Sequence, residues 1–276
     1  MTQTPDAVEN HYGRGGILES ILGALRGMGK DPAQLQPADL APVDEFHIRG
    51  RESTIELATR AGLRPGLRVL DVGCGLGGSA RYLATEYGCS VAGIDLTREY
   101  TEVASELTQR VGLADKVKFR QASALELPFA DGEFDIVWTE HVQMNIADKR
   151  AFYAELARAL KPGGKLVFHD IFAGTGGAPH YPVPWAETPG ISFLATPGEA
   201  RAILEQLGLR FLDWADRTPP AMAWFAATVE RIRQSGLPPL GMHLLTGPTA
   251  TDKIGNMLRN LQEARIAVWQ AVAQKA

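Results

Sequence analysis

The sequence predicts an α/β fold built around a doubly wound parallel sheet. Three observations lead to this prediction. From residue 64 onward, short apolar runs typical of strands alternate with segments of helical pattern. A glycine-rich turn at residues 73–78 follows the first of these strands and opens a helix. The chain has 276 residues, 45% hydrophobic and 22% charged, which suffices for a full α/β core with an added cap.

The first 63 residues are expected to form a helical cap on this core. Apolar residues at helical spacing predict a short helix near residues 17–25 and a stronger one near residues 52–61. Prolines interrupt residues 31–42, where we expect no regular element. A poorly ordered leader is the alternative interpretation of this region.

The core is expected to span residues 64–216. Apolar runs predict strands at residues 67–72, 90–95, 116–121, 134–138, 166–169 and 209–214. Helical patterns between them predict helices at residues 79–87, 98–111, 147–160 and 199–207. The sequence Lys161-Pro162-Gly163-Gly164 should stop the third of these helices.

Residues 173–197 are rich in glycine, proline and aromatic residues, and they predict a long inserted loop. A loop of this length in a compact domain is usually functional or disordered, and its His, Tyr and Trp favour function.

After the core, helices are predicted at residues 220–234 and 251–263. The last stretch, residues 265–273, is ambiguous. Its alanines and glutamines favour a helix, whereas Ile266, Val268 and Trp269 favour a strand.

The composition narrows the function classes. The net charge is −4, from 28 basic and 32 acidic residues without a basic run, which argues against a nucleic-acid partner. Cys74 and Cys89 supply neither a disulfide framework nor a metal-binding spacing, so we expect no metal and a reducing cytoplasm. We see no signal peptide, and no apolar stretch approaches the ~20 residues of a membrane span, so stable membrane insertion is not expected.

The glycine turn is the strongest single motif. It runs from Asp71 to Gly78, and its glycines let the backbone turn tightly and approach a ligand. Gly73, Gly75 and Gly78 also satisfy the fingerprint of dinucleotide-binding proteins. Asp95, at the end of the next strand, would hold a ribose hydroxyl in either interpretation.

Three features favour a different ligand from a dinucleotide. Asp71 ends the first strand just before the glycines, where it would repel a pyrophosphate but not a cationic ligand. Residues 122–129 read Ala-Ser-Ala-Leu-Glu-Leu-Pro-Phe after the third strand. Residues 158–166 place Leu-Lys-Pro-Gly-Gly directly before the fifth strand.

Together these segments resemble the class I S-adenosylmethionine (SAM) dependent methyltransferase family over residues 64–215. The ordered set is specific, although each motif alone is weak. The matching segments are residues 71–77, 123–129, 134–138 and 160–166. The resemblance implies a Rossmann-like, seven-stranded sheet whose last strand is antiparallel, and it therefore favours a strand at the C-terminus.

The resemblance also implies that SAM is the cofactor and S-adenosyl-L-homocysteine (SAH) the product. Gly73 and Gly75 would approach the methionine end of SAM, with Asp71 near its amino group. Asp95 would hold the ribose hydroxyls, and Leu96 would pack on the adenine.

Three further positions follow from the same resemblance. Ser123 and Ala124 would meet the adenine edge. Family members often carry an acid where this chain has Ser123, so the bond to the adenine amino group should be neutral and weaker. Glu140 would lie near the sulfonium and methionine end.

The acceptor is expected outside the carboxyl ends of the strands, where the cap, the turns after strands four and five and the long loop converge. Tyr12, Met144, Tyr181 and Trp185 are the candidate contacts, and they suit a half-apolar pocket. The rings of Tyr181 and Trp185 would flank a cationic or aromatic acceptor.

A histidine is expected as general base for a phenol or carbon acceptor, whereas an amine needs only to lose a proton on binding. His141 is the first candidate, because the resemblance places the turn after strand four beside the methyl group. His47 and His180 come next. For each of them a structural hydrogen-bonding role is the alternative.

At a finer level, residues 77–83, 144–149 and 181–185 are similar to the sarcosine/dimethylglycine and the ubiquinone, tocopherol and sterol methyltransferases. This implies a small-molecule acceptor methylated on N, O or C. The alternatives are C-methylation of a prenyl quinol or sterol-like lipid, an NAD(P)-dependent oxidoreductase, and a non-catalytic SAM-binding module. A homodimer is left open.

Overall fold

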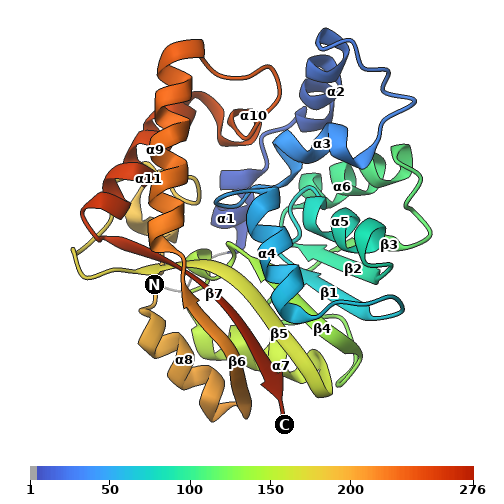
Figure 1. Ribbon diagram of the computed structural model, residues 1–276, viewed down its shortest axis with the longest axis vertical. Coiled ribbons are helices and arrows are strands. Elements are labelled where there is room, and N and C mark those ends of the chain that lie inside the picture. The colour runs from blue at the N-terminus through green and yellow to red at the C-terminus, as the bar shows by residue number, and fades with distance from the viewer. Residues whose placement is uncertain (1–4) are drawn as a thin grey trace.

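The computed structural model describes residues 5–276, and a seven-stranded sheet lies at its centre (Figure 1). The strands are β1 (Arg68–Val72), β2 (Ser90–Asp95), β3 (Val117–Gln121), β4 (Phe134–Glu140), β5 (Leu160–Ala173), β6 (Leu209–Asp216) and β7 (Ile266–Lys275). Their order is β3-β2-β1-β4-β5-β7-β6. β1 to β5 pair in parallel, while β7 runs antiparallel to β5 and β6. The predicted fold class is confirmed.

The C-terminal segment is a strand, as the family resemblance implied. β7 lies between β5 and β6 and pairs with β5 from Lys165↔Gln274 to Ala173↔Ile266. Both of its faces are covered, and Val268 and Val272 are fully buried. An interior strand buried on both sides favours such β-branched residues, which outweighs the helix propensity of the neighbouring alanines.

The fifth strand is longer than predicted. Lys161-Pro162-Gly163-Gly164 ends the preceding helix as expected, but Leu160 already pairs with Phe134. The register then shifts, and regular pairing resumes at Ile136↔Lys165. The proline and glycines therefore form an irregularity inside a strand, which is where a sheet tolerates a proline.

The helices of the cap and core are α1 (Pro5–Tyr12), α2 (Ile17–Gly27), α3 (Pro37–Asp44), α4 (Arg51–Ala61), α5 (Gly78–Glu86), α6 (Arg98–Arg110) and α7 (Lys149–Ala159). Those after β5 are α8 (Pro197–Gln206), α9 (Thr218–Ser235), α10 (His243–Thr246) and α11 (Ala250–Gln262). None of these described helices is long and apolar enough to cross a membrane. Residues 1–4 of the predicted cap lie outside the described residues.

We predicted no regular element over residues 31–42, and this prediction was wrong because α3 begins at Pro37. A proline in the first helical turn loses no hydrogen bond and presets the backbone. The N–H of Gln36 donates to the Asp39 carboxylate (2.9 Å), which fixes the start of the helix. Pro42 lies inside this short helix. The prolines therefore mark a helix start as well as a break.

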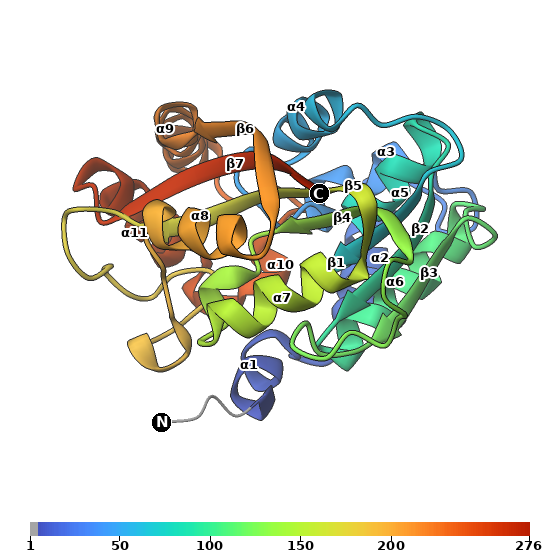
Figure 2. The ribbon, with the colours of Figure 1, turned by 90° about the horizontal axis from the view of Figure 1, so that it is seen from below.

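Helices cover both faces of the sheet (Figure 2). On one face, α4 and α5 bury Leu57 and Leu83 against Trp138 of β4. On the other, α7 and α8 bury Phe152 and Leu204 against the same sheet. Two further apolar clusters, one around α2, α3 and α6 and one around α9 and α11, lie at the end of the sheet away from the C-terminus (Figure 1). The site lies between these two clusters and the sheet.

Candidate active site

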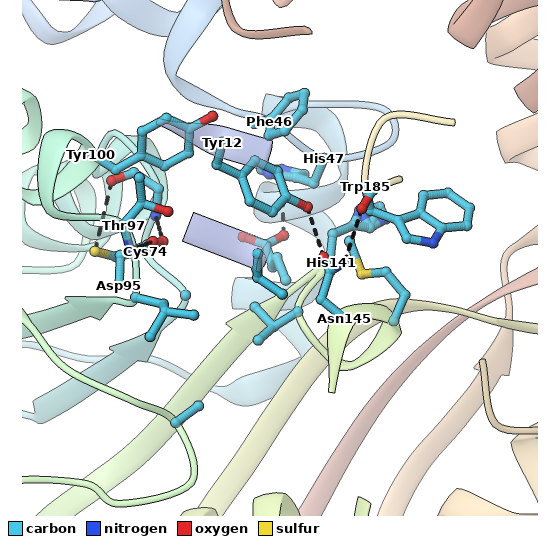
Figure 3. A pocket seen from close by; sticks show the side chains of 18 of the residues that line it. Tyr12, Phe46, His47, Cys74, Asp95, Thr97, Tyr100, His141, Asn145 and Trp185 are labelled. Atoms are coloured by element: carbon cyan, nitrogen blue, oxygen red, sulfur yellow. Dashed lines mark hydrogen bonds and ion pairs between the residues drawn. The ribbon is translucent and has the colours of Figure 1, made fainter. Parts of the chain in front are cut away.

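A cavity of about 610 Å³ lies at the carboxyl ends of β1, β2 and β4 (Figure 3). The residues that follow these strands line it, as do residues of α1, the segment 46–48, the long loop, α9 and α11. Ligands of doubly wound sheets bind at this place, where the strand order reverses. The cap and the C-terminal helices therefore close a site whose base is the sheet.

The glycine turn forms the base of the cavity. The N–H groups of Gly73 and Cys74 both donate to the carbonyl of Ile94 (2.8 and 2.9 Å), which fixes the turn. Gly75 has φ +52, and nothing lies within 4 Å of the place a Cβ would take, so its backbone is open to a ligand. At Gly73 a Cβ would lie 2.2 Å from Val142, so this glycine also lets the turn after β4 pack closely.

Asp95 lies at the rim of the glycine turn. Its Oδ2 accepts the N–H of Gly75 (3.0 Å), and its Oδ1 accepts the N–H of Thr97 (2.8 Å). Burial raises the pKa of Asp95, and these amide hydrogen bonds oppose the rise. The carboxylate is thus held in one orientation while it still lines the cavity, as a partner for ribose hydroxyls requires.

Asp71, at the start of the glycine turn, has an incompletely satisfied carboxylate. Its side chain is buried, and Oδ2 has no hydrogen-bond partner. Burial raises its pKa well above the usual range, and the nearby charges of Glu140 and Asp95 raise it further. A buried carboxylate is stable only when paired, so a cationic group in the cavity would stabilise it. The amino group of SAM fits this requirement.

Glu140 ends β4 at the wall of the cavity. Its Oε2 accepts hydrogen bonds from Ser79 Oγ (2.5 Å) and Trp138 Nε1 (2.8 Å). Its Oε1 accepts none and lies 3.4 Å from Nε2 of His47. One oxygen is therefore fixed by the core, and the other is available to a ligand.

Leu96, Ser123 and Ala124 also line the cavity, which brings all eight predicted cofactor residues to it. The hydroxyl of Ser123 accepts the N–H of Leu125 (3.1 Å) and so stabilises its own turn. The contacts of these three residues with adenine stay predictions.

Three histidines meet beside Glu140. The ring centroids of His141 and His169 are 4.8 Å apart, and each ring lies 6.2 Å from that of His47. Burial lowers the pKa of His141 well below its usual value, and the other two histidines lower it further. His141 lines the cavity, and its buried Nε2 has no hydrogen-bond partner, so the neutral imidazole keeps one unused nitrogen.

The other two histidines are held by the protein. Nε2 of His47 contacts the carbonyl of Gly50 (3.0 Å) and Oγ1 of Thr54 (2.9 Å). Nε2 of the fully buried His169 lies 3.1 Å from the carbonyl of Ile48, and burial lowers its pKa to about 3. Within residues 5–276, no group of three or more histidine, cysteine, aspartate or glutamate side chains is arranged to hold a metal ion.

His169 was not among the predicted site residues. The position of His169 in the fifth strand could have indicated it. β4 and β5 are parallel neighbours, and Glu140 pairs with His169 in the sheet.

Two predicted residues do not reach the cavity. The long loop is anchored on α11, where the N–H of His180 donates to Asn260 (2.7 Å) and its Nε2 lies 2.8 Å from Glu263. These contacts hold His180 away from the cavity, which it does not line. Tyr181 instead packs against the apolar cluster of α9 and α11.

The predicted acceptor contacts Tyr12, Met144 and Trp185 do line the cavity. Asn145, which the sequence placed in the turn after the fourth strand without a role, joins them. Its Oδ1 accepts the Tyr12 hydroxyl (2.8 Å), and its Nδ2 donates to the carbonyls of Trp185 (2.9 Å) and Ile191 (2.8 Å) (Figure 3). One carboxamide therefore fixes the cap helix, the turn after β4 and the long loop together.

Two buried ionisable side chains, Asp170 and Lys149, hold the turn that carries His141 through hydrogen bonds to its backbone. The Asp170 carboxylate accepts the N–H groups of Val142 and Gln143 (both 3.1 Å). Burial raises the pKa of Asp170 to about 6. Nζ of Lys149 donates to the carbonyl of Gln143 (2.6 Å). The turn is thus rigid before any ligand binds.

Comparisons with known proteins agree with this site. Residues 70–168 match the family described as "Methyltransferase domain". Tocopherol O-methyltransferase, chloroplastic, from Arabidopsis thaliana is 43% identical over 100 residues, 36% of this chain and 29% of that protein. Glycine/sarcosine/dimethylglycine N-methyltransferase from Actinopolyspora halophila is 30% identical over 175 residues, 63% of this chain and 31% of that protein. The chain therefore spans less than a third of either relative's length.

Geranyl diphosphate C-methyltransferase from Streptomyces coelicolor A3(2), solved with Mg²⁺, geranyl diphosphate and SAH, is similar over the full chain. The TM-score is 0.72 at 18% identity, covering 100% of this chain and 98% of that one, which shows a common fold. The matched domain contains the glycine turn, Asp95 and Glu140, the residues that form the cofactor end of the cavity. Over residues 70–168, the chain is therefore similar to methyltransferase domains.

Proposed function

We propose that this protein transfers a methyl group from SAM to a small-molecule acceptor. The observation that carries this proposal is the buried Asp71 carboxylate, whose Oδ2 has no partner in a cavity shared with Asp95 and the open backbone of Gly75. Asp71 would pair with the amino group of SAM, and Asp95 would hold its ribose hydroxyls. Bound there, SAM supplies an activated methyl group and leaves as SAH.

The protein's main task is alignment, because the methyl group is already activated. The closed wall built by Tyr12, Asn145 and Trp185 orients the acceptor. Glu140, fixed by Ser79 and Trp138, lines the adjoining wall. These groups are in place before ligands bind, which lowers the entropic part of the barrier.

His141 is the general base in this proposal. A base must be neutral and must present a free nitrogen to the acceptor. Burial keeps the ring of His141 neutral, the residue lines the cavity, and no protein group occupies its buried Nε2. Nε2 of His47 is engaged by Gly50 and Thr54, which makes His47 the weaker candidate.

The names of the relatives differ in acceptor, from a tocopherol to glycine and geranyl diphosphate, so they do not decide the acceptor of this chain. C-methylation of a prenyl quinol or sterol-like lipid is the second candidate. The observation in its favour is the apolar lining from Met144, Trp185, Phe225 and Met257. A homodimer and a cytoplasmic location stay predictions from the sequence.

The first test compares binding and transfer. Calorimetric titration with SAM, SAH and NADH should give dissociation constants in about the micromolar range for SAM and SAH and no binding of NADH. Methyl-labelled SAM should then label an acceptor from a panel of phenols, quinols and amines. Binding of NADH without SAM would reject the proposal. Tight SAM binding without transfer to any acceptor would favour a non-catalytic SAM-binding module.

A further inference from the structure

We propose that the acceptor is an electrically neutral molecule with an apolar body that presents a hydroxyl group of the phenol or enol type to His141. This inference rests on the proposed function and specifies the substrate class of the same site. One apolar cluster forms the acceptor end of the cavity, and Tyr12 packs against it. Its lining members are Ile48, Met144, Ile171, Trp185, Phe225 and Met257.

An anionic acceptor finds no counter-ion there. Among residues 5–276, no lysine or arginine lines the cavity. Two buried cations are already engaged: Arg81 pairs with Asp44 (2.6 Å), and Nζ of Lys149 donates to the carbonyl of Gln143. Burying a carboxylate or phosphate without a paired cation is strongly unfavourable. The site therefore disfavours amino-acid and diphosphate acceptors.

A cationic acceptor is disfavoured for a similar reason. The acids that line the cavity already have roles: Asp44 pairs with Arg81, and Asp148 accepts the N–H of Ala151 at the start of α7. The remaining three, Asp71, Asp95 and Glu140, belong to the cofactor end, where SAM carries an ammonium and a sulfonium. An alkylammonium would thus enter an apolar chamber without an acid of its own.

A hydroxyl group matches the polar atom that this chamber offers. The Tyr12 hydroxyl is engaged by Asn145, and Nε1 of Trp185 donates to Ser192 (2.9 Å), but Nε2 of His141 is buried without a partner. A phenol or enol hydroxyl would donate its hydrogen bond to this nitrogen. During transfer its O–H bond breaks, the proton passes to Nε2 of His141, and the oxygen takes the methyl carbon as the carbon–sulfur bond breaks.

The methionine side chains of the chamber suit an aromatic ring system and adapt to acceptors of different shapes. Met144 and Met257 line its apolar end, and Met242 also lines the cavity. Unbranched thioether side chains adapt to irregular apolar surfaces and make favourable contacts with aromatic rings.

The test uses three matched probes on the SAH-loaded protein. They are para-butylphenol, the same phenol with its chain ending in a carboxylate, and the same phenol with its chain ending in a primary ammonium. Calorimetric titration should show the neutral phenol binding at least about tenfold more tightly than either charged probe. Equal or tighter binding of a charged probe would overturn the inference, and so would failure of the SAH-loaded protein to bind the neutral phenol. Failure to bind SAH at all would instead reject the proposed function.

A variant reverses the expected preference. Met257→Lys places a cation in the apolar wall, and it should improve binding of the carboxylate probe relative to the neutral phenol by about tenfold or more. Met257→Leu, which keeps the wall apolar, is the matched control and should keep the wild-type order. An unchanged order in a folded Met257→Lys protein would contradict the assignment of this wall to the acceptor. The comparison of probes on the wild-type protein stands even if the lysine variant does not fold.

Discussion

The hydroxyl group of Tyr12 donates a hydrogen bond to Oδ1 of Asn145 across 2.8 Å. The two residues are 133 positions apart in the chain and belong to the cap helix α1 and the turn after β4. Because the amide nitrogen of Asn145 also holds the carbonyl of Trp185, this carboxamide links three walls of the acceptor end. The shape of the acceptor end therefore depends on a side chain that need not touch the cofactor.

This linkage predicts a selective effect on the acceptor. Tyr12→Phe removes one hydrogen bond, which costs about 1 kcal/mol of free energy. The KM for the acceptor should therefore rise by about fivefold, with the Kd of SAH unchanged. Asn145→Asp keeps the acceptor for Tyr12 but loses the donor to Trp185, so its effect should be larger. Steady-state kinetics with calorimetry measure both. A loss of SAH affinity equal to the loss for the acceptor would mean that the linkage is only structural.

His141→Ala should lower kcat/KM for a phenol acceptor by about 10²–10⁴-fold, because the proton then has no buried base to receive it. His180→Ala is the control, since His180 lies outside the cavity and should leave turnover unchanged. Labelled methyl transfer measures both variants. Full turnover in the His141 variant would show that alignment alone carries the step.

The buried His169 predicts a loss of stability in acid. Its native pKa of about 3 lies below the usual 6.5 of the unfolded chain, so protons bind the unfolded chain preferentially between these values. The free energy of unfolding therefore falls as pH drops through this window. Asp170, with a pKa raised to about 6, acts in the opposite direction, because its protonated form favours the native state.

His169→Gln isolates the histidine contribution. Urea unfolding at pH 7 and pH 5 should show a pH-dependent loss that is smaller in the variant by about 2 kcal/mol. Glutamine retains a donor for the carbonyl of Ile48 and so limits the disturbance. The same pH-dependent loss in both proteins would mean that His169 does not titrate as its burial implies.

Asp95→Ala should weaken SAH binding by about tenfold or more, because it removes the carboxylate expected to hold the ribose and frees the N–H groups of Gly75 and Thr97. Glu102→Gln, an exposed acid on α6, is the control and should bind SAH like the wild-type protein. Unchanged affinity in Asp95→Ala would remove the ribose assignment.

The local sequence pattern was sufficient to predict most of the sheet and the cofactor end of the cavity. Apolar runs marked β1 to β6, and Asp71 and Asp95 lie in the last residues of strands whose carboxyl ends meet, so their convergence was predictable. The helix α3 was missed because Pro37 favours both a break and a helix start, and only the hydrogen bond between Gln36 and Asp39 distinguishes them.

The acceptor end was harder to predict, because tertiary contacts set the path of the long loop. His180 and Trp185 are five residues apart, yet contacts with Asn260 and Glu263 hold the first away from the cavity while the second lines it. No periodic pattern marks that difference. The role of Asn145 likewise depends on a partner in the cap, far away in the chain.

The affinity of SAH for Asp71→Asn, compared with the wild-type protein and Glu102→Gln, tests the central claim most directly. Asparagine keeps the size of the side chain but removes the buried charge that would pair with the amino group of the ligand. Calorimetry should show a Kd raised by about tenfold or more in Asp71→Asn and unchanged in Glu102→Gln. Equal affinity in all three proteins would contradict the assignment of this carboxylate, and with it the orientation of the ligand in the cavity.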